Sequence, residues 1–342
     1  DDHVFTINIK DASVDAVKLA TLNTKTKGVI TVDSTTVTGT IGGIEDIYDT
    51  DKTGLAGLGN EAINVTGNIT VAQANALSGY STGVAKASFA KAALSTFDGL
   101  ITSTDNYSIE IDDTSVNASA LAALDAKTIG TVTATDVTLI TGALSDVKSL
   151  YESNVVGGIT GLGNENVTLT DEGAVQASDL NYVNSNTQGA LVANKITTLK
   201  GSISEIKLAY KGFSDGTLTG LGNENITISD IAPSSSDVAD IKALTTGTVT
   251  VSLSSSSVTA SVLKTLDVDS TEVINAAGIT SITGAAADVK TVLESDGISG
   301  LGDEAVTLTD TSLTVAALTT LDSKTDGTIN ASTVGTLTGS VE

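Results

Sequence analysis

Four glutamates in the chain stand in the same glycine-rich setting and could contribute carboxylates to a metal site. Each closes the string Gly-Leu-Gly-Asn-Glu or Gly-Leu-Gly-Asp-Glu and is followed by a run rich in Val, Ile and Thr. Carboxylates and amides in a loop are ligand types that Ca²⁺ prefers. The other interpretation is a turn that recurs in every repeat, and we favour it because a stack of repeats needs a turn at the same place each time. The strings occupy 57–61, 161–165, 220–224 and 300–304 and end in Glu61, Glu165, Glu224 and Glu304.

The first of these strings follows an acidic stretch that resembles the beginning of a helix-loop-helix calcium loop. Asp49, Asp51 and Gly54 occupy the first, third and sixth positions of such a loop. The twelfth position is then Asn60, which cannot supply the bidentate carboxylate that this loop uses. A looser site would not need that carboxylate. We therefore predict Ca²⁺ as the one candidate ligand, held by Asp49, Asp51 and Glu61 with neighbouring carbonyl groups.

The sequence offers no constellation for nucleophilic or acid–base catalysis. It has no Cys and a single imidazole, His3, near the start of the chain. No nucleophile elbow, phosphate-binding loop or dinucleotide fingerprint occurs. Carboxylate pairs are frequent, but 41 acidic residues produce such pairs by chance. We therefore predict that the chain is not an enzyme.

Charge and composition exclude several classes of partner and site. The chain has 17 basic residues, all of them Lys, against 41 acidic ones, and its net charge is −24. Nucleic acids and anionic membrane surfaces are bound through basic faces, so we expect neither partner. No stretch approaches the ~18 consecutive apolar residues of a membrane helix, so we expect no membrane insertion. The absence of Cys excludes disulfides and thiolate metal sites.

Two further repeated patterns predict the elements that position the turns. In the first, apolar or small residues follow one another in steps of two, three and three, and Ser or Thr often stands at the start, where helix N-caps belong. This spacing predicts the end of a strand that runs into a short helix. The clearest copies begin at Val14, Val116, Val175, Val258 and Leu313.

The second pattern is a strand-like run that ends in a glycine and continues into a helix. An acidic residue follows the glycine by four positions and is itself usually followed by Val-Lys or Ile-Lys. We expect the strand to turn into the helix at this glycine, because glycine adopts backbone conformations that other residues avoid. The glycines of this pattern are Gly42, Gly142, Gly201, Gly284 and Gly339.

Together the repeats predict an α/β solenoid of short parallel strands and short helices, with about 26 residues per unit. A short strand and a short helix cannot bury their apolar sides alone, whereas stacked repeats share one continuous core. Strands joined through helices should pair in parallel through right-handed crossovers. Aromatic residues make up only 3% of the chain, and small aliphatic side chains suit a core that repeats the same layer. We expect residues 1–342 to form a single continuous solenoid, as a segment of a longer repeat array.

The strings GLGNENVTLTD, SVNASALAALDAKT and VTLITGALSDVKSLYES resemble the Thr/Asp-rich tandem repeats of very large secreted or cell-surface proteins of cyanobacteria. Some of those proteins are labelled S-layer-associated or hemolysin-type calcium-binding. The resemblance covers essentially the whole chain and implies an extracellular, cell-surface location with a structural or adhesive role. The glycine-aspartate nonapeptides that bind Ca²⁺ in hemolysin-type β-rolls are absent here, so the resemblance does not imply calcium binding by that mechanism.

The expected function is therefore structural. We expect a secreted repeat protein that forms a rod, fibre, filament or surface-layer element by self-assembly or with other cell-surface components. Exposed sheet edges at the ends of the array could pair one subunit with the next. The alternative is an adhesive or polysaccharide-binding surface module, or the spacer of a large adhesin. Self-assembly of the purified protein distinguishes the two, because a spacer remains monomeric.

Overall fold

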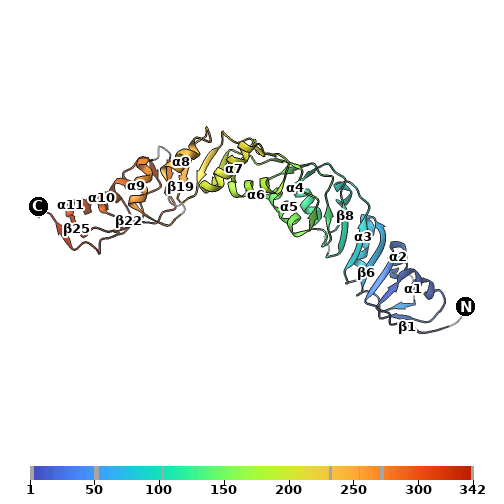
Figure 1. The fold of residues 1–342 in the computed structure, drawn as a ribbon. Helices are drawn as coiled ribbons and strands as arrows, with labels where there is room; N and C mark the ends of the chain where they lie inside the picture. The colour runs from blue at the N-terminus through green and yellow to red at the C-terminus, as the bar shows by residue number, and fades with distance from the viewer. Residues whose placement is uncertain are drawn as a thin grey trace. The chain divides into compact units, whose positions relative to one another are not determined.

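The computed structural model describes residues 4–49, 54–101, 104–230, 233–253, 255–269 and 273–339. Its contacts divide the chain into two units, Asp1–Thr168 with Asn186–Gly189, and Leu169–Ser185 with Ala190–Glu342. Each unit alternates short strands with short helices along the sequence (Figure 1). The described residues form eleven α-helices, and every strand pairing among them is parallel, which confirms the predicted α/β class. The expectation of one continuous array stays a prediction.

The first unit is built from strands that are mostly two to five residues long. Its strands are β1 Ile7–Ile9, β2 Ser13–Asp15, β3 Ile30–Val32, β4 Thr36–Thr40, β5 Leu55–Ala56, β6 Ala62–Ile69, β7 Ala85–Phe89, β8 Asn106–Glu110, β9 Ser115–Asn117, β10 Val132–Thr133, β11 Leu139–Gly142, β12 Ile159–Thr160 and β13 Asn166–Leu169. Its helices are α1 Ala16–Asn23, α2 Ile41–Tyr48, α3 Val71–Tyr80, the 3₁₀ helix η1 Leu94–Phe97, α4 Ala118–Asp125 and α5 Leu144–Val156. The strands form a three-stranded sheet β1-β3-β5 and a seven-stranded sheet β12-β10-β8-β7-β6-β4-β2, and β9 pairs with β11.

The second unit repeats this organisation. Its strands are β14 Ala174–Gln176, β15 Leu191–Val192, β16 Thr198–Gly201, β17 Leu218–Thr219, β18 Asn225–Ile228, β19 Val249–Ser252, β20 Ser257–Thr259, β21 Val273–Asn275, β22 Ser281–Gly284, β23 Ile298–Ser299, β24 Ala305–Leu308, β25 Ser312–Thr314, β26 Ile329–Asn330 and β27 Thr336–Thr338. Its helices are α6 Ala177–Asn186, α7 Ile203–Asp215, α8 Ser235–Lys242, α9 Ala260–Asp269, α10 Ala286–Leu293 and α11 Val315–Asp322. The sheets are β14-β16-β18-β19-β21-β23, β20-β22-β24-β26 and β25-β27, and β15 pairs with β17.

Paired strands place equivalent residues of successive repeats beside one another. In the first unit, Val37 pairs with Ile63, and both are buried. In the second, Ile282 pairs with Val306, and both are buried as well. Residues paired in register between neighbouring strands lie 20 to 27 positions apart, which brackets the predicted repeat length. The core is therefore a set of aliphatic columns, each one residue wide and renewed in every repeat.

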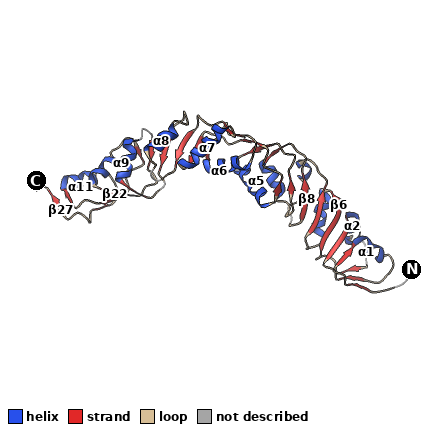
Figure 2. Cartoon of the chain, viewed as in Figure 1, coloured by secondary structure: helices blue, strands red, loops and turns tan. Residues whose placement is uncertain are grey.

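The helices lie side by side along the strands, as Figure 2 shows for α1 and α2, both of which contact β4. All five copies of the first sequence pattern form the end of a strand that runs into a helix, as predicted. Short polar side chains cap these helices: the Asp15 carboxylate accepts from the Lys18 amide at 2.9 Å, and the Thr314 hydroxyl from the Ala317 amide at 3.1 Å. The longest described helices, α5 and α7, have 13 residues each. No helix in the described ranges has the length and apolar character needed to cross a membrane.

The first copy of the glycine pattern lies three residues earlier than the sequence analysis predicts. Gly42 falls inside α2, and a Cβ added there would meet nothing within 4 Å. Gly39 is the glycine that packs against a helix, here the first residue of α1, because an added Cβ would lie 3.1 Å from the Ala16 Cβ. Gly142 stands in the same relation to Ala118, at 2.9 Å. Two glycines three residues apart allowed either alignment, and only the approach of strand to helix selects Gly39.

This register predicts opposite effects for two glycine substitutions. Gly142→Ala should destabilise the first unit by about 1–3 kcal/mol, because the added methyl group overpacks the contact with Ala118. Gly42→Ala should stabilise it by about 0.5–1 kcal/mol, because its site is open and helical. Urea unfolding followed by circular dichroism measures both. A larger loss for Gly42→Ala than for Gly142→Ala would restore the original alignment.

Candidate functional site

The four strings that end in glutamate form turns, called here the glycine–glutamate turns, and their glutamate side chains are buried. The exposed fraction is 1% for Glu61, Glu165 and Glu304 and 2% for Glu224. Removing a carboxylate from water is costly unless hydrogen bonds replace the lost hydration. Each turn must therefore supply its glutamate with donors.

The first donors are backbone amides of the same turn. The Glu224 Oε2 accepts from the amide of Gly222 at 2.7 Å and from that of Asn223 at 3.1 Å. The equivalent pairs of amides serve Glu165 and Glu61 at 2.8 to 3.0 Å. Hydrogen bonds to an ionised acceptor are stronger than bonds between neutral groups. The carboxylate thus closes a small ring on its own turn.

The glycines allow the backbone of the turn to point its amides at the glutamate carboxylate. Gly220 and Gly222 both have left-handed φ values, +92° and +116°. A Cβ on Gly220 would lie 2.6 Å from the backbone nitrogen of Asn194 in the preceding repeat. Glycine is therefore needed at this position both for its conformation and for the close approach of two backbones.

In each turn, a side-chain hydroxyl from the following repeat donates to the backbone carbonyl of the glutamate. The Thr245 hydroxyl donates to the Glu224 carbonyl at 2.6 Å and accepts from the Gly247 amide at 2.9 Å. The Thr246 amide adds a bond to the Gly222 carbonyl at 2.9 Å. A Cβ on Gly247 would lie 2.2 Å from the Glu224 carbonyl oxygen, so glycine is required here too. The equivalents of Thr245 are Ser81 on Glu61, Thr187 on Glu165 and Thr325 on Glu304.

Sequence analysis missed this Ser/Thr-x-Gly motif, which pairs with every glycine–glutamate turn. The hydroxyl residue follows the glutamate by 20 to 22 positions in all four cases. Counting from each glutamate would have found it. The motif is hard to see otherwise, because Ser, Thr and Gly are abundant throughout the chain.

In two turns a tyrosine hydroxyl binds the second carboxylate oxygen. Tyr151 donates to Glu165 Oε1, and Tyr210 donates to Glu224 Oε1. Each tyrosine is the eighth residue of a 13-residue helix, and both rings are buried. Burial raises the pKa of Tyr151 and of Tyr210 well above the ordinary value of 10.0, and the bond to the neighbouring carboxylate raises it further. These two turns are therefore anchored to a helix as well as to the next repeat.

The other two turns follow helices of only eight residues and lack this bond. Tyr48 holds the position of Tyr151, but its buried hydroxyl has no partner among the described residues, and its ring stacks on Tyr80 with centroids 5.2 Å apart. Glu61 Oε1 instead accepts from the Gly59 amide at 3.1 Å. At the last turn, Leu293 stands in the tyrosine position.

The residues predicted to bind Ca²⁺ are only partly described by the structure. Asp49 is exposed at the end of α2, and Asp51 lies outside the described residues. Both oxygens of Glu61 already accept amide hydrogens of its own turn. Within the described ranges, no three His, Cys, Asp or Glu side chains group in a way that could hold a metal ion. Calcium binding by Asp49, Asp51 and Glu61 stays a prediction.

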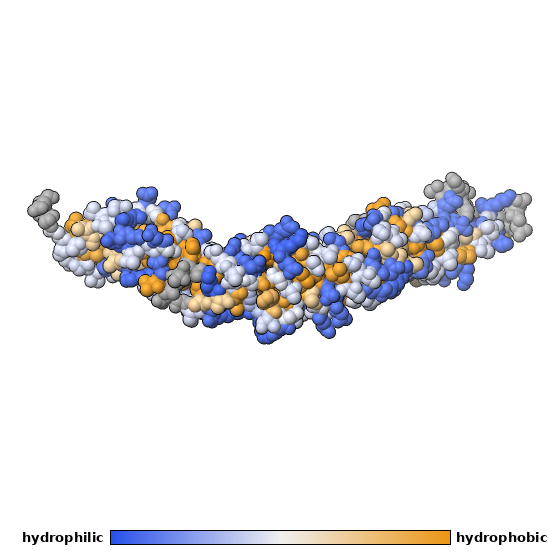
Figure 3. Space-filling model, turned by 90° about the horizontal axis from the view of Figure 1, so that it is seen from above, coloured by the Kyte–Doolittle hydropathy of each residue, from blue (hydrophilic) through white to orange (hydrophobic). Residues whose placement is uncertain are grey.

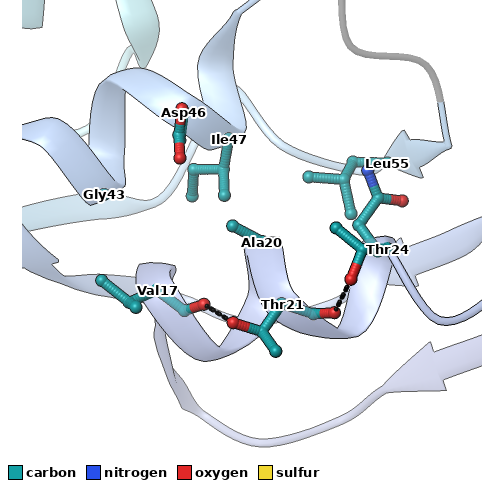
Figure 4. A pocket seen from close by; sticks show the side chains of 9 residues that line it. Val17, Ala20, Thr21, Thr24, Gly43, Asp46, Ile47 and Leu55 are labelled. Atoms are coloured by element: carbon teal, nitrogen blue, oxygen red, sulfur yellow. Dashed lines mark hydrogen bonds between the residues drawn. The ribbon is translucent and has the colours of Figure 1, made fainter.

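A groove of about 310 Å³ lies between α1 and α2. Figure 4 shows Ala20, Ile47 and Leu55 facing it. The Thr21 hydroxyl on its wall donates to the Val17 carbonyl at 2.8 Å and is thus engaged within its own helix. Among the described residues that line this groove, the hydroxyls of Thr21 and Thr24 both donate to backbone carbonyls, so neither is paired with a base.

A second groove, of about 510 Å³, lies between α7 and α8. Its wall includes Lys207, whose ammonium group binds Asp237 and Asp240, each at 2.9 Å. Tyr210 and Leu244 line it as well. The Lys207 ammonium group therefore bridges α7 to α8, and the Tyr210 hydroxyl is already bonded to Glu224.

Comparison with known proteins adds no assignment: no protein-family model matches the chain, and no curated protein matches it. The glycine–glutamate turns are closed sites, in which carboxylate, amide and hydroxyl groups bind one another. Their hydrogen bonds join one repeat to the next.

Removing the tyrosine hydroxyl should weaken the turn it anchors. Tyr210→Phe leaves a buried carboxylate oxygen of Glu224 without its donor, and hydrogen bonds to charged groups contribute about 1.5–3 kcal/mol. We expect a loss of that size in the free energy of unfolding of the second unit, measured with urea. Tyr80→Phe serves as the control in the first unit, because no described residue bonds to that hydroxyl. It should change the stability of that unit by less than about 0.5 kcal/mol. Equal effects of the two substitutions would contradict the anchoring role.

The same tyrosines predict sensitivity to alkali. Because the pKa of Tyr151 and Tyr210 is raised in the folded state, the unfolded chain releases these protons first. Their contribution to stability is complete below pH 10 and declines above it, by about 1.4 kcal/mol per pH unit for each proton. Urea titrations from pH 8 to pH 11 should show a steeper decline in the wild type than in Tyr151→Phe or Tyr210→Phe. Parallel declines would refute the assignment.

Proposed function

We propose that the chain is an α/β solenoid with a structural function: an extracellular rod, fibre, filament or surface-layer element that assembles from identical subunits or with other cell-surface components. The observation that carries this proposal is the use of the repeated polar residues. At each glycine–glutamate turn they link one repeat to the next, as Glu224 and Thr245 do. A protein whose most elaborate side-chain arrangement serves the joining of repeats is suited to building length, and it needs no catalytic residues for that role.

The surface charge makes assembly from identical subunits dependent on salt or on divalent cations. Figure 3 shows polar and apolar residues interspersed over the face in view. Some of the lysines bind acids of neighbouring repeats: Lys91 binds Glu110 at 2.9 Å and Asp136 at 2.8 Å. Subunits of net charge −24 repel one another, and the repulsion falls with added salt or with bound divalent cations. Ca²⁺ is therefore proposed as an aid to assembly in a secreted, cell-surface setting.

One observation favours the alternative, a monomeric spacer or an adhesive module. The last strands of several sheets, β5, β12 and β23, have only two residues each. Very short edge strands are a common means of preventing edge-to-edge pairing. Lateral assembly through these edges is therefore disfavoured, and assembly must use other surfaces if it occurs.

Negative-stain electron microscopy tests the proposal. Purified protein should form ordered fibres or sheets with Ca²⁺, and fewer in chelator. Mg²⁺ and NaCl at matched ionic strength are the controls, because general screening would let them replace Ca²⁺. Asp49→Asn with Asp51→Asn should abolish only a Ca²⁺-specific effect. Monomers in every condition would refute self-assembly and favour the spacer.

A further inference from the structure

The last glycine–glutamate turn is held less firmly than the others. Glu304 is 1% exposed, and its Oε1 has no hydrogen-bond partner in the described part of the chain. The corresponding oxygens of Glu165 and Glu224 each accept a tyrosine hydroxyl. An unsatisfied charged acceptor in a buried site favours any rearrangement that returns it to water.

Two further contacts of the Glu304 turn are weaker than those of the Glu224 turn, and one residue adds a charge beside it. Glu304 accepts from one described amide, that of Gly302 at 2.8 Å, where Glu224 accepts from two. The Thr325 hydroxyl lies 3.1 Å from the Glu304 carbonyl, against 2.6 Å in each of the other three turns. Asp303 replaces the asparagine of the other turns and brings a second negative charge next to the buried carboxylate.

The helix in front of this turn is also shorter. Helix α7 continues for five residues beyond Tyr210, to Asp215, whereas α10 ends at Leu293. Segment 294–304 therefore lacks both the tyrosine anchor and the helical residues with which its equivalent, segment 211–224, begins.

We propose that the segment 294–304 is an opening joint of the second unit. It detaches from α10, and its strand β23 separates from β21, while β22 and β24 remain paired. It opens more often than segment 211–224. Local openings are governed by the contacts that each segment makes. Here the Glu304 carboxylate accepts fewer hydrogen bonds than that of Glu224, although the Asp326 amide still binds the Gly302 carbonyl at 2.7 Å. Such a joint lets one repeat yield without unfolding its neighbours, as expected when repeats contact only adjacent ones.

Hydrogen exchange on the complete 342-residue protein tests the joint. Peptides covering 296–304 should show protection factors at least about tenfold lower than those covering 216–224, the aligned residues that lie outside α7. One charged hydrogen bond changes an equilibrium by about that factor. Peptides covering β24 and β18 are the control and should differ less, which separates local opening from loosening of the whole region. Equal protection of the two joint segments would overturn the proposal.

A pair of substitutions assigns the cause. Leu293→Tyr places a hydroxyl where Tyr210 carries one and should raise the protection of segment 294–304 about tenfold. Leu293→Phe adds the ring without the hydroxyl and should not. If the phenylalanine variant protects as well as the tyrosine variant, the unpaired oxygen is not the cause, and the proposal fails. Asp303→Asn, which leaves the core untouched, should also slow exchange in this segment and keeps the test decisive if Leu293→Tyr does not fold.

Discussion

A carboxylate cannot be buried without donors, and much of the architecture follows from burying one at each glycine–glutamate turn. The turn must expose its amides to the side chain, which requires left-handed glycines such as Gly222. The glutamate carbonyl on the far side then faces the next repeat, where Thr245 binds it. One buried charge thereby fixes the turn, the approach of the following strand and the glycine that permits that approach.

The same turns mark where the chain passes from one sheet to another. Strand β5 ends the three-stranded sheet, and after the turn at 57–61 the chain enters the seven-stranded sheet as β6. Strand β23 likewise ends the six-stranded sheet before the turn at 300–304, and β24 lies in the next sheet. Short strands are sufficient because the aliphatic columns and the turns add to the backbone hydrogen bonds between paired strands in holding successive repeats together.

The sequence predicted the class of fold well, because apolar spacing and capping residues are local signals. The step from Val116 into a helix, for example, needs only the residues that follow it. The alignment on Gly42 was wrong because strand–helix proximity is not a local property. The tyrosine anchor was invisible for the same reason: Tyr151 and Glu165 are 14 positions apart and meet only once the helix has formed. The sequence analysis favoured turns over metal sites, and the geometry of Glu61 agrees with that preference.

The bond between Glu224 and Thr245 has a consequence for how such a chain changes over generations. Because each turn and its Ser/Thr-x-Gly partner belong to successive repeats, cutting the gene between them would separate a buried carboxylate's turn from the hydroxyl that closes it. Recombination that keeps both partners in one exchanged block leaves every junction complete. The block that can be copied or lost without harm therefore runs across a repeat boundary, and length can vary in whole blocks of that kind while the local chemistry stays the same.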